Sequence, residues 1–79
     1  MKKLFMVQYE YDSERIVEVD FYFADDINDV IYATRHFRAH GSWTETIAQS
    51  NAKFHNKDYW GDENAIKDIF ISQQDYKEL

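Results

Sequence analysis

The chain has 79 residues with 44% apolar and 18% aromatic side chains, a composition typical of one small folded domain over 1–79 and not of a disordered chain. It has no cysteine, which excludes disulfides, thiol nucleophiles and thiolate metal sites, and therefore favours the cytoplasm over a secreted setting. A net charge of −6 disfavours direct binding to nucleic acid or to an anionic membrane, and no apolar run approaches the roughly 20 residues of a membrane span.

Two stretches near the start predict an antiparallel hairpin. Residues 4–11 and 15–23 alternate with period two and are rich in β-branched and aromatic side chains, and a short polar turn at 12–14 joins them. We expect one face of the hairpin to be apolar and to be covered by helices: Phe5, Val7, Val17, Val19, Phe21 and Phe23. The other face is expected to be exposed and largely acidic: Gln8, Glu10, Glu18, Asp20 and Tyr22.

Residues 25–41 carry the signals of a helix. Asp25 and Asp26 are favourable at its N-terminus, and Gly41 is a typical residue just beyond a C-terminus. Apolar positions recur at the spacing of one helical face. They are Ile27, Val30, Ile31, Thr34 and Phe37.

The segment 42–56 has two interpretations. Ser42-Trp43-Thr44-Glu45 forms a capping box, and helical spacing links Trp43, Ile47 and Phe54, so a second helix is the favoured prediction. The alternative is a strand at 43–48 that turns at 50–51 into a second hairpin.

The last third predicts a loop, a strand and a polar tail. Residues 57–64 surround Gly61, residues 66–72 are rich in Ile and Phe, and residues 73–79 are expected to fray or to form one helical turn. The predicted fold class is α+β: an antiparallel β-hairpin followed by one or two helices and a final strand, in the order ββα(α)β, with the helices packed on one sheet face.

The sequence contains no catalytic signature. It has neither a Gly-rich phosphate loop nor a G-x-S-x-G elbow, so we predict no enzymatic activity, no catalytic residue and no cofactor. His36 and His40 have the i, i+4 spacing of helical zinc ligands, but the chain has neither Cys nor an H-E-x-x-H pattern, and a solvated helix face accounts for both residues without a metal. We therefore predict no metal site.

Carboxylates in the first third form the candidate contact surface. Glu18 and Asp20 alternate along one strand and would project together, about 7 Å apart, with Glu10 on the neighbouring strand. Such an array can imitate a nucleic-acid backbone and occupy a basic groove, although a solvated face that prevents edge aggregation has the same pattern. Aromatic anchors would be Tyr22 and Trp60, unless Tyr59 and Trp60 cap the core instead. The predicted partner-binding residues are Glu10, Glu18, Asp20, Tyr22, Asp25, Asp26 and Trp60.

In size, acidity and expected element order, this chain resembles the small accessory proteins of bacteriophages and mobile elements, including anti-CRISPR and anti-restriction inhibitors. The resemblance lies in the Met-Lys-Lys start and in a hairpin formed by LFMVQYEY and RIVEVDFYF. It implies a non-enzymatic inhibitor in the host cytoplasm that binds a defence complex at its basic nucleic-acid site. The second hypothesis is a homo-oligomeric structural or regulatory module, such as a homodimer, that buries an aromatic surface.

Overall fold

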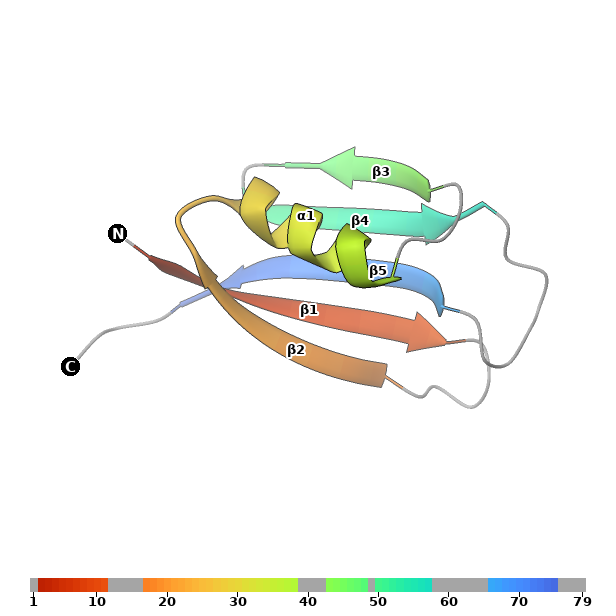
Figure 1. Cartoon of the computed structure of the whole chain (residues 1–79), viewed down its shortest axis with the longest axis horizontal. Helices are drawn as coiled ribbons and strands as arrows, with labels where there is room; N and C mark the ends of the chain where they lie inside the picture. The colour runs from red at the N-terminus through yellow and green to blue at the C-terminus, as the bar shows by residue number, and fades with distance from the viewer. Residues whose placement is uncertain (1, 12–16, 39–42, 49, 58–65, 76–79) are drawn as a thin grey trace.

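The computed structural model describes residues 2–11, 17–38, 43–48, 50–57 and 66–75 (Figure 1). In chain order the elements are β1 (Lys3–Tyr11), β2 (Val17–Ala24), α1 (Ile27–Arg38), β3 (Trp43–Ile47), β4 (Asn51–Asn56) and β5 (Ile66–Gln74). The strands form one antiparallel sheet in the order β2-β1-β5-β4-β3. Figure 1 shows α1 lying across one face of this sheet.

The first hairpin and the helix are confirmed. β2 pairs antiparallel with β1, from Ala24 opposite Lys3 to Val17 opposite Glu10. At the start of α1, Oδ1 of Asp26 accepts a hydrogen bond from the backbone N–H of Asn28 at 2.8 Å, which is the geometry of an N-cap. The predicted C-terminal stop, Gly41, lies outside the described residues.

The predicted fold class is wrong, because the protein is mostly a five-stranded antiparallel sheet with one short helix. The favoured second helix at 42–56 is replaced by the alternative, a hairpin of β3 and β4 that runs from Trp43 opposite Asn56 to Ile47 opposite Ala52. The backbone N–H of Ala48 donates to the carbonyl of Asn51 at 2.8 Å and closes the turn. Ala52 and Phe54 are alternate residues of β4, and their side chains are buried in the core on one face of the sheet.

The final strand is confirmed and occupies the centre of the sheet. β5 pairs with β1 on one side and with β4 on the other, so the last strand in sequence joins the two hairpins. It buries Ile69 and Ile71 and continues to Gln74, two residues beyond the predicted end. The tail prediction is therefore wrong at residues 73–74, and residues 76–79 lie outside the described part of the chain.

The core lies between α1 and the sheet face that α1 covers. The helix contributes Ile27, Val30 and Ile31, which follow the predicted i, i+3, i+4 spacing. The buried apolar side chains of the core are Phe5, Val7, Tyr9, Ala24, Ile27, Val30, Ile31, Ala52, Phe54, Ile69 and Ile71.

The side of β2 that faces the core is the opposite of the predicted side. A turn limited to residues 12–14 would place Val7 opposite Val19, but in the structure Val7 lies opposite Asp20. Directly opposed residues of an antiparallel pair share a face, and a shift of one residue exchanges every side chain between faces. The prediction that Phe5 and Val7 face the helix is confirmed. It is wrong for Val17, Val19, Phe21 and Phe23, which lie on the other face.

Candidate functional site

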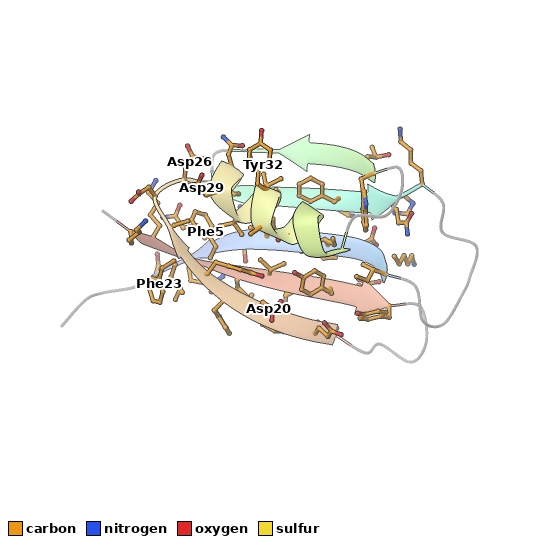
Figure 2. The ribbon with its side chains drawn as sticks, viewed as in Figure 1. Phe5, Asp20, Phe23, Asp26, Asp29 and Tyr32 are labelled. Carbon is orange, nitrogen blue, oxygen red and sulfur yellow. The ribbon has the colours of Figure 1, made fainter. Side chains whose placement is uncertain are left out.

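The sheet face turned away from α1, here called the open face, carries apolar side chains along its β2 edge. This β2 stripe consists of Val17, Val19, Phe21 and Phe23, whose exposed fractions are 47%, 43%, 60% and 57%. Figure 2 shows Phe5 close to α1 and Phe23 apart from it. Large apolar side chains with this exposure on one side of one strand are typical of an interaction surface.

The neighbouring strand extends the β2 stripe at one end. On β1, Leu4 lies opposite Phe23 and Met6 lies opposite Phe21, and both β1 side chains are half-buried. A fully buried aromatic side chain covers about 150–250 Å². At the exposed fractions given above, the two Val and two Phe side chains of the stripe together expose roughly 300–400 Å² of apolar surface. That area is within the range of the largest apolar patches of monomeric proteins, which are often functional.

The other side of β2 is acidic. Glu18 accepts a hydrogen bond from the hydroxyl of Tyr11 at 2.9 Å and is exposed, while Asp20 is half-buried. Tyr22 lies opposite Phe5 and packs against the core. β2 therefore presents apolar side chains on the open face and carboxylates on the face of α1.

The structure brings together only part of the predicted contact surface. Glu18, Asp20 and Tyr22 share one side of β2, but Glu10 lies opposite Val17 and therefore on the open face, because of the register described above.

The other predicted contact residues have separate settings. Asp25 pairs with Lys2 at 3.4 Å between exposed side chains, and Asp26 caps α1. Figure 2 shows Asp26 and Asp29 beside the first turn of this helix. Trp60, and Tyr59 beside it, lie outside the described residues, so their role stays a prediction.

The open face is polar on the strands away from β2. Nδ1 of His55 lies 2.7 Å from Oδ1 of Asp68, a carboxylate that is only 10% exposed. Nζ of Lys53 lies 5.2 Å from the centre of the Phe70 ring, in the range of a cation–π contact. Beside this contact is a shallow depression of about 340 Å³. It is lined by Gln8, Thr46, Ala48, Asn51, Ala52, Lys53, Phe70, Ile71 and Ser72.

Two kinds of site were sought in the part of the chain that the structure describes, a metal-binding cluster and a membrane-spanning helix. No group of three or more His, Asp or Glu side chains there is placed to hold a metal ion, and the His36 and His40 side chains lie outside that part. With 12 residues, α1 falls short of the length and apolar content needed to cross a bilayer.

Sequence analysis missed the exposure of the β2 stripe. The signal that bears on it is the number of residues between the last paired positions of the hairpin. A turn at 12–14 would pair Tyr11 with Arg15 and leave three residues between them, whereas the observed pair, Glu10 opposite Val17, leaves six, residues 11–16. This odd difference exchanges the two faces of β2, and the sequence alone does not fix it.

Comparison of the chain with protein family models, with curated proteins and with solved structures gives no match. The candidate site therefore rests on the chemistry and geometry of this chain, and its central element is β2, with an apolar and an acidic side.

Proposed function

We propose that this chain is a non-enzymatic protein-binding module that acts by stoichiometric contact through β2. The observation that carries this proposal is the exposed β2 stripe, in which Phe21 and Phe23 each leave more than half of their surface uncovered. Aromatic side chains are common anchors of protein interfaces because they bury much apolar area at low entropic cost.

The acidic side of β2 supports an inhibitory role against a basic partner. Glu18 and Asp20 alternate with the apolar anchors along β2 and lie on its opposite face, and the net charge of the whole chain is −6. The partner class that fits is a protein with a basic nucleic-acid-binding groove, as in the anti-CRISPR and anti-restriction proteins, with the host cytoplasm as the site of action. The observed element order differs from the expected one, so the resemblance to those proteins now rests on size and acidity.

The test is affinity capture from host lysate, followed by reconstitution of the complex from purified components. The variants are Glu18→Lys/Asp20→Lys and Phe21→Ser/Phe23→Ser. The matched control is Tyr32→Ser, because Tyr32 is 71% exposed on α1, away from the open face. Circular dichroism and thermal melts check that all variants fold.

We expect wild type and the Tyr32 variant to form the same stoichiometric complex, and both β2 variants to bind at least tenfold more weakly. The charge variant should lose the part of the affinity that falls with added salt, because screening weakens exposed charge pairs. Unchanged binding by both β2 variants would overturn the proposal.

A homo-oligomeric module is the second candidate. The β2 stripe contains no charged side chain, and the same apolar patch on two copies can pack around a two-fold axis. Sedimentation of the purified protein separates the two candidates. A dimer that is lost in Phe21→Ser/Phe23→Ser, kept in Glu18→Lys/Asp20→Lys and little affected by salt would favour self-association.

A further inference from the structure

β2 lies at an edge of the sheet. Within the described residues it pairs with β1 alone, and its eight residues, VEVDFYFA, include no Pro, Gly or Lys. Native edge strands commonly use Pro, Lys, bulges or short length to prevent pairing with other chains. An edge strand also directs alternate backbone N–H and C=O groups outward, so β2 is a suitable template for another strand.

The two sides of β2 specify what a neighbouring strand would contact. Its residues would alternate between the open face, beside Val19 and Phe21, and the face of α1, beside Glu18 and Asp20. Directly opposed cross-strand pairs are favourable when apolar side chains meet or when charges are opposite, and unfavourable when charges are alike. The complementary strand therefore alternates apolar with basic residues.

We propose that the partner adds an extended segment to the sheet beside β2, with Lys or Arg at alternate positions and apolar residues between them. This inference rests on the proposed function and identifies the element of the partner that β2 recognises. Backbone hydrogen bonds supply the affinity of such strand addition, and the alternate side chains supply its specificity.

A second copy of this chain fits the β2 edge less well. Two-fold antiparallel registers centred on Asp20 place two copies of Asp20 opposite each other, and registers centred on Val19 place Glu18 opposite Asp20, so both oppose like charges. The register centred on Phe21 avoids this repulsion, but it places Glu18 opposite Ala24 and Asp20 opposite Tyr22, so neither carboxylate gains a basic partner. The other edge strand, β3, has only five residues and so offers fewer backbone groups for pairing.

The probe is a synthetic seven-residue peptide of alternating Lys and Val. One control peptide replaces every Lys with Glu. The other keeps every side chain and charge but carries N-methyl groups on its backbone amides, so that it cannot donate backbone hydrogen bonds. Binding is followed on the full chain by amide-resolved NMR shifts and hydrogen exchange.

We expect the Lys/Val peptide to bind saturably and at least tenfold more tightly than either control, with new amide protection within residues 17–24 and none in β3. In Glu18→Lys/Asp20→Lys the preference should reverse, so that the Glu/Val peptide binds more tightly. Equal binding by the N-methylated peptide, protection confined to β3, or no reversal in the charge variant would overturn strand addition.

The intact partner distinguishes failure of this inference from failure of the proposed function. If Phe21→Ser/Phe23→Ser abolishes the complex with the captured protein but that complex leaves the β2 amides unprotected, strand addition is wrong and the proposed function stands. If the complex survives in both β2 variants, the proposed function itself is wrong.

Discussion

Val7 and Val19 have the same side chain and the same place in an alternating pattern, yet their environments differ. Val7 is fully buried beneath α1, whereas Val19 is 43% exposed on the open face. The sequence predicts that both are buried, because alternation identifies the two faces of a strand but does not tell which one meets the helix. That choice depends on the register of the hairpin.

Alanine substitution of each valine tests this register at the scale of single residues. Val7→Ala should lower the free energy of unfolding by about 2 kcal/mol, because it removes fully buried methyl groups and leaves a cavity. Val19→Ala should lower it by less than about 0.5 kcal/mol, as expected for an exposed position. Urea denaturation measures both, and equal losses would contradict the register.

Among the elements, α1 could be predicted in detail because its signals are local. Asp26 caps the helix and the buried side chains follow a 3.6-residue period. The secondary structure of the segment 42–56 could not be decided from the sequence, because its capping box and spacing fit a helix while its Trp, Thr and Ile content and the turn at 50–51 fit a hairpin. β4 pairs with β3 on one side and with β5, the next strand in sequence, on the other, and the pairing with β5 joins two separate segments, so local periodicity does not report it.

Removal of the cap should destabilise α1 specifically. Asp26→Ala should lower the free energy of unfolding by about 1 kcal/mol, because the N–H of Asn28 loses its acceptor. Asp25→Ala is the matched control, and its exposed pair with Lys2 should contribute less than about 1 kcal/mol. Thermal melts of the two variants compare them directly, and an equal effect of both would argue against the cap.

At the scale of the whole molecule, the sheet order decides what is exposed. β5 occupies the centre, β2 and β3 form the edges, and α1 covers one face, so the face opposite the helix remains open. The sequence predicts that Glu18 and Asp20 lie on one side of the same strand, and the register places them there, while their role in binding stays a prediction. It could not identify the apolar side of that strand as the exposed one, because exposure depends on the assembly of all elements.

The central claim is that the β2 stripe faces solvent, and paramagnetic broadening by a soluble nitroxide measures this directly on the free protein. NMR signals of the Val17, Val19, Phe21 and Phe23 side chains should broaden strongly, while those of Phe5, Val7 and Tyr9 should be protected. Protection of the stripe together with broadening of the Phe5, Val7 and Tyr9 signals would contradict the register, the open face and the function proposed for it.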